Sequence, residues 1–395
     1  MASGVPRNRA SGSGRRPAKR ARTQPDAPPL AGDWASLPSG PAGLVAERVL
    51  AGDVADYARF RAVCTAWRAC CADPRAHGAL DRRFHPRRWV MLPRAFAARG
   101  RRPFLNVATG ERVRVRLPDL RRHAVLGPTA EGLVVLCRKG TLVVRLLNPL
   151  TGQIADLPPA STLLVDRGPG DGSTDTAVED YPLLNAGMAG DSTVVLHFAF
   201  SILAVAAPGD ARWTRLDPRD DGIVSATPCN GRFYCATTRN LKVVDATAGE
   251  RPRLAPAVAG FHCWDTPMRP YLAEVDGELV MTRPPSWAGL RWECKVYRVS
   301  TDAGREKAAA ATPRLGGAAV FIGLAGGRAV AVPAGLCGSV SADTVYFCWS
   351  DGDGQRPKVD ACNFVDGRVE TDCRRNLPWS MADYLACYVA EIEDW

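Results

Sequence analysis

The sequence lacks the features that mark membrane, secreted and zinc-binding proteins. No apolar run approaches the roughly 20 residues of a membrane-spanning helix, and no hydrophobic signal segment follows the basic start. Its 13 cysteines are odd in number and form no Cys-x-x-Cys pair, and the five histidines complete no zinc-ligand spacing. We therefore expect reduced, mostly buried cysteines, no metal, no membrane contact, and a location in the cytoplasm or the nucleus.

Signatures of catalysis are missing as well. The chain has no glycine-rich phosphate loop with Lys-Ser/Thr, no Gly-x-Ser-x-Gly and no His-Glu-x-x-His. Cys64 falls inside a helical pattern, where a thiol is a core residue more often than a nucleophile. The sequence predicts a protein that is not an enzyme and binds no cofactor.

Positive charge is concentrated at the N-terminus. Residues 1–32 carry seven basic side chains and one acidic one, while the whole chain has a net charge of +10. The rest of the chain is only weakly basic, which argues against nucleic-acid binding by the folded part. Because the tail has almost no large apolar residues, we expect it to be disordered. Its run 15–22 is typical of a nuclear-import signal, although a solvated tail and an organelle transit peptide fit the composition too.

A helical pattern occupies residues 33–80. Ser39 can cap a first helix with Pro41 at its first position, and Gly52-Asp53 should end it. Asp53 or Asp56 can cap a second helix, and a third, short one should contain Trp67. Three short helices form a very small core, and such a unit usually needs a partner to cover its apolar face.

From residue 88 to about 390 the pattern changes to short β-branched runs separated by Gly, Pro, Asp and Asn. Turn pairs such as Asn230-Gly231 and Asp276-Gly277 join neighbouring runs, and no helical pattern alternates with them. Strands are expected at 133–137, 141–147, 193–198, 202–206, 222–226, 232–236, 241–244, 271–275, 278–282, 293–299, 318–324, 329–332, 339–341 and 344–349.

The strands recur as hairpins at a spacing of roughly 40–50 residues. About 300 residues at this period correspond to about six or seven four-stranded blades. The predicted fold class is α+β multidomain, with a small three-helix domain followed by a large all-β domain that is a six- or seven-bladed β-propeller. A pair of large β-sandwiches would give similar hairpins and is the alternative.

The helical domain resembles the F-box, a module that docks onto the Skp-type adaptor of cullin-based ubiquitin ligases. The resemblance rests on Leu37-Pro38 at the entry, on the apolar helix around Leu44, and on Arg61-Ala62-Val63-Cys64-Thr65-Ala66-Trp67-Arg68 at the end. It implies that the adaptor is contacted by Leu37, Pro38, Leu44, Val45, Val49, Val63, Cys64, Trp67 and Arg68. Where the family has acidic and leucine residues after Leu-Pro, this chain has Gly40 and Gly43, and a glycine inside a helix costs about 1 kcal/mol.

Several short segments of the all-β domain resemble the KIB-type β-propeller, an F-box-associated domain of plants. These segments are 147–152, 208–214, 231–234, 271–279, 296–298 and 343–347, and their order after an F-box is more specific than any one of them. Their polar and glycine residues suit turns (Asn148, Gly152, Gly231, Gly277), and their aromatic residues suit packing between blades (Trp213, Tyr234, Tyr297, Tyr346, Phe347).

Together the two resemblances imply a substrate-recognition subunit of an SCF-type (Skp–cullin–F-box) ubiquitin ligase, which directs a target protein to ubiquitination and proteasomal degradation. The implied partners are a Skp-type adaptor, cullin through that adaptor, and an unidentified protein target on the propeller, with neither nucleic acid nor membrane. One alternative is a non-ligase binding or inhibitory protein whose F-box has decayed, as Gly40 and Gly43 suggest. Another is a propeller enzyme, which would have a funnel lined by clustered acids or histidines.

Overall fold

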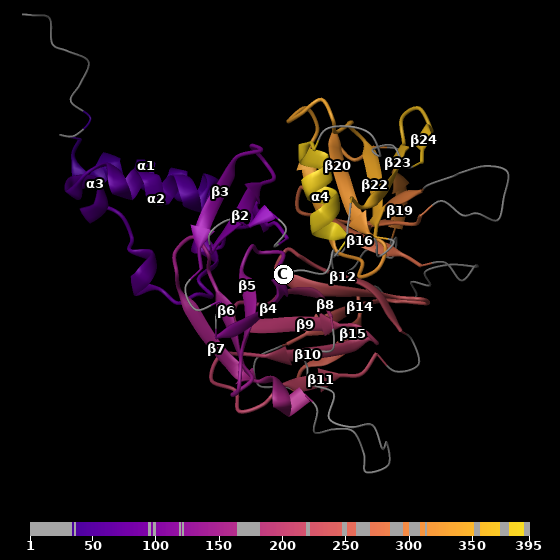
Figure 1. Ribbon diagram of the computed structural model, residues 1–395, viewed down its shortest axis with the longest axis horizontal. Helices are drawn as coiled ribbons and strands as arrows, with labels where there is room; N and C mark the ends of the chain where they lie inside the picture. Colours follow the sequence, from indigo (N-terminus) through magenta and orange to yellow (C-terminus); the bar gives the residue numbers. More distant parts are fainter. Residues whose placement is uncertain are drawn as a thin grey trace, which may run out of the picture.

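Six β-sheets surround a common axis in the computed structural model, and three helices project from one side of them (Figure 1). The structure describes residues 34, 37–93, 96–97, 100–117, 120, 122–163, 182–218, 222–246, 251–257, 269–284, 295–299, 309–312, 314–350, 356–371 and 379–390. The expected basic tail, residues 1–32, lies outside them. No helix in the described part of the chain is long and apolar enough to span a membrane.

The projecting helices are α1 (Ser39–Gly52), α2 (Val54–Val63) and α3 (Thr65–Ala69). Sheet 1 contains β1 (Trp89–Met91), β2 (Arg101–Asn106) and β3 (Arg112–Arg116); sheet 2 contains β4 (His123–Pro128), β5 (Val134–Arg138), β6 (Val143–Leu147) and β7 (Ile154–Pro159). Sheet 3 contains β8 (Leu183–Ala189), β9 (Thr193–Phe198), β10 (Ile202–Ala206) and β11 (Thr214–Leu216). Sheet 4 contains β12 (Ile223–Cys229), β13 (Arg232–Thr237), β14 (Leu241–Asp245) and β15 (Arg253–Pro256).

Sheet 5 contains β16 (Tyr271–Val275), β17 (Glu278–Thr282), β18 (Val296–Val299) and β19 (Ala309–Thr312). Sheet 6 has the order β21-β20-β22-β23-β24, with β20 (Ala318–Gly323), β21 (Ala329–Pro333), β22 (Thr344–Trp349), β23 (Lys358–Asn363) and β24 (Val369–Glu370). The last helix, α4 (Met381–Val389), follows it. The fold is therefore a six-bladed β-propeller, which decides between the six and seven blades expected and rules out the paired sandwiches.

Tight turns build the blades as their residue types predict. Asn230 and Gly231 have φ values of +47° and +74°, and Asp276 and Gly277 have +50° and +81°. Such left-handed pairs match the twist of a two-residue hairpin, and they pair β12 with β13 and β16 with β17 in antiparallel register. The strand predicted at 339–341 is wrong, because this segment lies in the turn between β21 and β22.

A second turn recurs and identifies equivalent blade positions. Asn106, Asn148 and Asn363 each accept two backbone N–H groups of the following residues through their side-chain oxygen, which is an Asx turn. These turns join β2 to β3, β6 to β7 and β23 to β24. By this equivalence β1–β3 correspond to the outer three strands of a blade, and β3 is its outermost strand.

Helix α4 was not expected, because the sequence was interpreted as all-β from residue 88 onward. Seven of its nine residues are buried, so it has no broad polar face toward the solvent. Its start carries a capping box, in which Asp383 accepts from the Ser380 backbone N–H at 2.6 Å. Its side chains pack in one cluster with both sheet 1 and sheet 6. The helix is thus wedged between the first and last blades, beside β20 in Figure 1.

The turn between β20 and β21 contacts α4 and the first residues of the inner strands β8 and β12. Arg328 is 3% exposed and donates to the carbonyls of Leu184 at 3.0 Å and Tyr388 at 3.3 Å. Asn185 donates to Gly326 O at 2.8 Å. Gly327 has a φ of +69°, and a Cβ there would lie 2.9 Å from Ser225 Cβ. The turn connects α4 with sheets 3 and 4, so ring closure depends on side-chain bonds as well as on strands.

Candidate functional site

The nine predicted adaptor-binding residues separate into an exposed and an inward-facing group. Leu44 and Val63 are each 62% exposed and Val45 is 38% exposed, and Pro38 and Arg68 are also at the surface. Leu37, Val49, Cys64 and Trp67 are partly buried. The first group is free to meet another protein, whereas the second determines the shape of the helical unit.

The inward-facing group holds the three helices together. Trp67 stacks on Phe60 with ring centroids 4.3 Å apart, and its indole Nε1 donates to Trp34 O at 3.0 Å. Cys64 caps α3 by accepting from the Trp67 backbone N–H at 3.4 Å. Val49 packs against the cluster of Ala46, Tyr57, Phe60 and Phe84. Substitutions of Trp67 would therefore affect folding as well as any partner.

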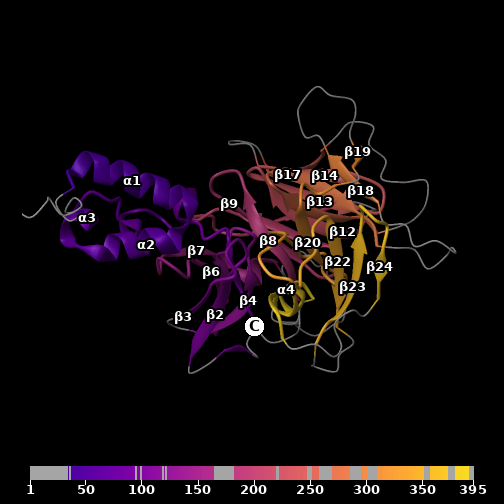
Figure 2. The same ribbon diagram turned by 90° about the horizontal axis from the view of Figure 1, so that it is seen from above.

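The exposed apolar residues of α1 lie on one side of the helix. Ala42 and Ala46, one turn apart, are buried against the other helices. Pro41, Leu44 and Val45 are three and four residues apart, so they share a different face of the helix, and they are exposed. Gly43, the neighbour of Leu44, lies near the end of α3, because a Cβ there would be 3.5 Å from Cys70 O. Helix α3 is at the end of the helical unit away from the propeller (Figure 2).

Gly40 and Gly43 both lie inside α1, so these two glycines do not prevent the helix from forming. The expected Ser39 cap is wrong: Pro38 occupies the N-cap position, and Ser39 is the first helical residue.

A Cβ at Gly40 would have no atom within 4 Å. Replacing Gly40 with alanine should therefore raise the free energy of unfolding of the helical unit by up to about 1 kcal/mol, because alanine loses less backbone entropy on folding. Urea denaturation monitored by far-UV circular dichroism would measure this gain, and a destabilised variant would contradict it.

Asp53 joins the helical unit to the propeller. Its Oδ1 accepts from Ala55 N at 2.7 Å and caps α2, as the sequence predicts. Its Oδ2 accepts from Trp89 Nε1 at 2.8 Å and from Asn106 Nδ2 at 3.0 Å, on β1 and β2. Ala55 packs in the same cluster as Trp89. One carboxylate thus fixes the orientation of α2 on sheet 1, and sequence reasoning found only the cap.

The segment after α3 crosses the turns at one end of the propeller. Arg82 donates to Gly190 O and pairs with Asp191 at 3.2 Å, next to the β8–β9 turn. Asn148 Nδ2 donates to Phe84 O at 2.7 Å in a buried contact. A Cβ at Gly132 would collide with Pro86 O. These contacts add a second attachment between the helices and the propeller.

Two buried titratable groups lie inside the blades. Burial raises the pKa of the Glu131 carboxyl, whose Oε1 accepts from Met188 N at 2.9 Å. Burial lowers the pKa of His197 to about 4, and neither of its ring nitrogens has a hydrogen-bond partner in the described structure. Thiols behave likewise, since burial raises the pKa of Cys235 to about 12. In each of these groups burial disfavours the charged form.

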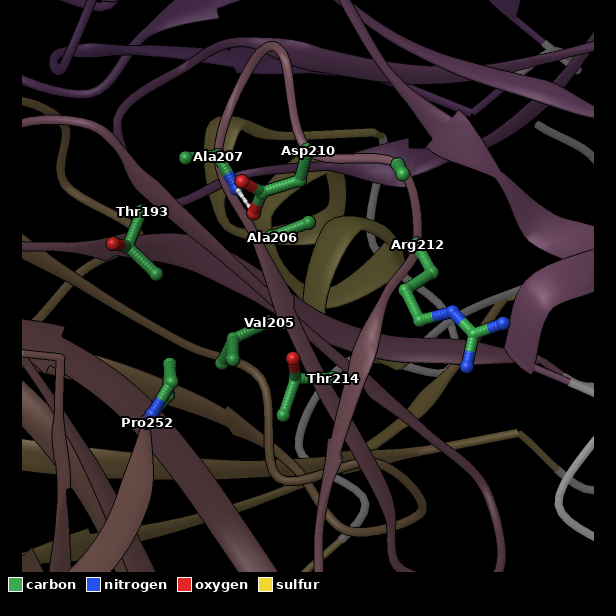
Figure 3. Close-up of a pocket in the computed structure, with 9 residues that line it drawn as sticks. Thr193, Val205, Ala206, Ala207, Asp210, Arg212, Thr214 and Pro252 are labelled. Atoms are coloured by element: carbon green, nitrogen blue, oxygen red, sulfur yellow. Dashed lines mark hydrogen bonds between the residues drawn. The ribbon is translucent and has the colours of Figure 1, made fainter. Parts of the chain in front are cut away.

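A shallow pocket opens beside β10 and β11 (Figure 3). The Asp210 carboxylate turns toward the backbone of its own loop and accepts from Ala207 N at 2.8 Å, while Arg212 extends in another direction. The residues that line the pocket are Thr193, Val205, Ala206, Ala207, Asp210, Ala211, Arg212, Thr214 and Pro252. This set contains no imidazole or thiol that could act as a base or nucleophile. Across the described residues, no group of three His, Cys, Asp or Glu side chains could hold a metal ion.

The motif residues of the propeller occupy the roles that their chemistry predicts. Gly152, Gly231 and Gly277 have positive φ, and Asn148 forms an Asx turn. Four of the aromatic residues are buried: Trp213, Tyr234, Tyr346 and Phe347. The fifth, Tyr297, is partly buried. These positions therefore stabilise the blades.

Comparison with known proteins gives one match that covers most of the propeller. The sequence model of the KIB1-4 beta-propeller matches residues 104–369. No curated protein matches the chain.

Solved structures show only remote similarity. An assembly of an S. cerevisiae Dbp5 variant with Nup159, a Gle1 variant, IP6 and ADP aligns at 11% identity, covering 59% of this chain and 70% of that chain, with a TM-score of 0.28. PorZ, a surface component of the type-IX secretion system of Porphyromonas gingivalis, aligns at 12% identity and a TM-score of 0.33. The alignment covers 72% of this chain but only 37% of PorZ.

Proposed function

The chain belongs to the KIB1-4 β-propeller family, and on this premise we propose that it is the substrate-recognition subunit of an SCF-type ubiquitin ligase. Helices α1–α3 bind a Skp-type adaptor, and the propeller binds the protein that is to be ubiquitinated. The chain itself forms no bond with ubiquitin. It supplies proximity, because holding a target near a conjugating enzyme raises the effective concentration of the target lysines.

The observation that carries this proposal is the exposed apolar surface of α1. Leu44 and Val45 are 62% and 38% exposed, and they lie in the first half of α1. An aliphatic cluster on a helix is a common way to anchor a protein interface. The surface therefore suits an adaptor that approaches the helices without touching the propeller.

The attachment at Asp53 supports the same function. An adaptor subunit works only if the target has a defined position relative to the adaptor, since effective concentration falls when the link is loose. Asp53 and the segment at Arg82 fix two sides of the helical unit on the propeller. A target held by the blades would thus keep a fixed geometry relative to the adaptor.

Replacing Leu44 with aspartate should weaken binding to a plant Skp-type adaptor by on the order of tenfold or more, because a charge replaces a central apolar contact. Isothermal titration of the purified chain against the adaptor would measure the loss. Val365→Asp is the matched control, because Val365 is 61% exposed on a propeller turn and should leave adaptor binding unchanged.

The wild-type chain must bind the adaptor for the proposal to stand. A folded wild type without adaptor affinity would contradict it and favour a propeller-binding protein with a decayed F-box. Equal loss in Leu44→Asp and Val365→Asp would place the contact elsewhere on the molecule.

A further inference from the structure

The outermost strand of sheet 1 carries a row of arginines. In β3 the side chains of Arg112, Arg114 and Arg116 are exposed, while Val113 and Val115 between them are partly buried. This alternation puts the three guanidinium groups on one face of the strand, about 7 Å apart. Arg101 stands opposite Arg116 on β2 and extends the row.

The positive charge of this region is local. Residues 87–122 contain eleven arginines and two acidic residues, although the chain after residue 32 is only weakly basic overall. Arg112 is held by Tyr384, whose hydroxyl accepts at 3.0 Å and whose ring lies 5.2 Å from the guanidinium. For Arg101, Arg114 and Arg116, by contrast, no carboxylate lies within ion-pair distance in the described part of the chain.

The same strand presents an open main-chain edge. β3 ends the order β1-β2-β3, so one of its edges pairs with no described strand. Other outer strands are less suitable: β11 has three residues and β24 has two, and β7 ends in Pro158-Pro159. A free edge without proline can accept an added strand.

We propose that β3 is a docking site for an extended acidic segment of a partner protein, which adds to sheet 1 as a further antiparallel or parallel strand. Acidic residues at alternate positions would face the arginines, because side chains on paired strands lie directly opposite one another. The residues between them would be apolar and would extend the layer of Val113 and Val115. The site is separate from the α1 surface and does not depend on the adaptor.

Two other occupants fit the surface less well. A second copy of the chain would place arginine rows opposite each other, and like charges on paired strands are destabilising. Single-stranded nucleic acid needs free aromatic faces for stacking. The neighbouring Trp379 is 45% exposed, but its ring is covered by Arg356 at 4.6 Å and contacted by Phe96.

The test is fluorescence anisotropy of the full chain with a labelled peptide Thr-Glu-Val-Glu-Val-Glu-Thr at low ionic strength. The double variant Arg114→Glu/Arg116→Glu should bind about tenfold or more weakly, because two attractive pairs become repulsive. Arg215→Glu is the matched control, since Arg215 is an exposed arginine on the outer strand β11. It should bind like the wild type, and so should Leu44→Asp.

Backbone methylation of the peptide separates strand addition from simple charge attraction. N-methyl groups on one set of alternate amides should abolish binding, and on the other set should leave it intact, since only one set faces β3. Equal binding by wild type and double variant would overturn the proposal. Tighter binding of a single-stranded oligonucleotide, lost in the same variant, would also overturn it and assign the surface to nucleic acid.

Discussion

Replacing Asp53 with alanine is expected to lower the free energy of unfolding by about 3 kcal/mol or more. The variant loses the cap of α2, which contributes about 1 kcal/mol. It also leaves two donors without their acceptor, Trp89 Nε1 and Asn106 Nδ2, on side chains that are 1% and 2% exposed. An unsatisfied buried donor costs about 1–3 kcal/mol, so the anchor is worth more than the cap. Guanidinium denaturation would measure the change.

Asp53→Asn separates the two roles of this carboxylate. Asparagine caps helices as well as aspartate does, but it has one acceptor oxygen instead of two, so when that oxygen caps α2 its NH2 group faces the donors of Trp89 and Asn106. The Asp53→Asn variant should therefore keep most of α2 and still lose most of the anchor. Asp56→Ala is the control, because Asp56 forms only an exposed pair with Arg59, and such pairs contribute about 0–1 kcal/mol. Equal, small effects in all three variants would show that the carboxylate does not couple the two parts.

Local chemistry explains why the propeller could be predicted from the sequence. Strands β9, β10, β16, β17 and β22 have the bounds that were expected, because each is a β-branched run closed by a turn of definite type. Strands that were missed break this pattern: β7 contains two prolines and β8 a glycine, and β23 alternates polar residues. Their pairing comes from the neighbouring strands of the blade, which no local window contains.

Long-range contacts explain what the sequence could not provide. Helix α4 is buried on all sides, so only its Ser380–Asp383 capping box could have identified it. The second role of Asp53 depends on residues more than 35 positions away. The arginine row was missed for another reason. Averaging the charge over the folded chain hid the excess in residues 87–122, and a window of one blade would have found it.

Replacing His197 with leucine should make the protein less sensitive to acid. His197 is fully buried on β9, and burial lowers its pKa from the ordinary 6.5 to about 4. Between these two pH values the unfolded chain binds a proton at this residue and the folded chain does not. The contribution of His197 to the stability of the wild type therefore falls as the pH falls below 6.5, by about 1.4 kcal/mol per pH unit. From pH 7 to pH 5, the leucine variant should gain about 2 kcal/mol relative to the wild type.

Other buried groups set the background of this pH profile. Burial also lowers the pKa of His85 to about 4, and the charge of Arg87 adds to this shift. Burial raises the pKa of Glu131, so this carboxyl binds a proton more readily in the folded chain and stabilises it as the pH falls. The absolute profile therefore mixes opposite slopes, and the difference between two variants is the quantity that isolates one histidine.

Phe198→Leu supplies the control for that difference. Phe198 neighbours His197 on β9 and is buried, so its substitution changes packing without removing a titratable group. Its stability difference from the wild type should be the same at pH 7 and pH 5, whereas that of His197→Leu should shift by about 2 kcal/mol in favour of the variant. The two ring nitrogens of His197 have no partner to stabilise a charge, and this is the physical reason for the expected shift. A pH-independent difference for His197→Leu would mean that the folded protein binds the proton as readily as the unfolded chain does, and it would contradict the prediction.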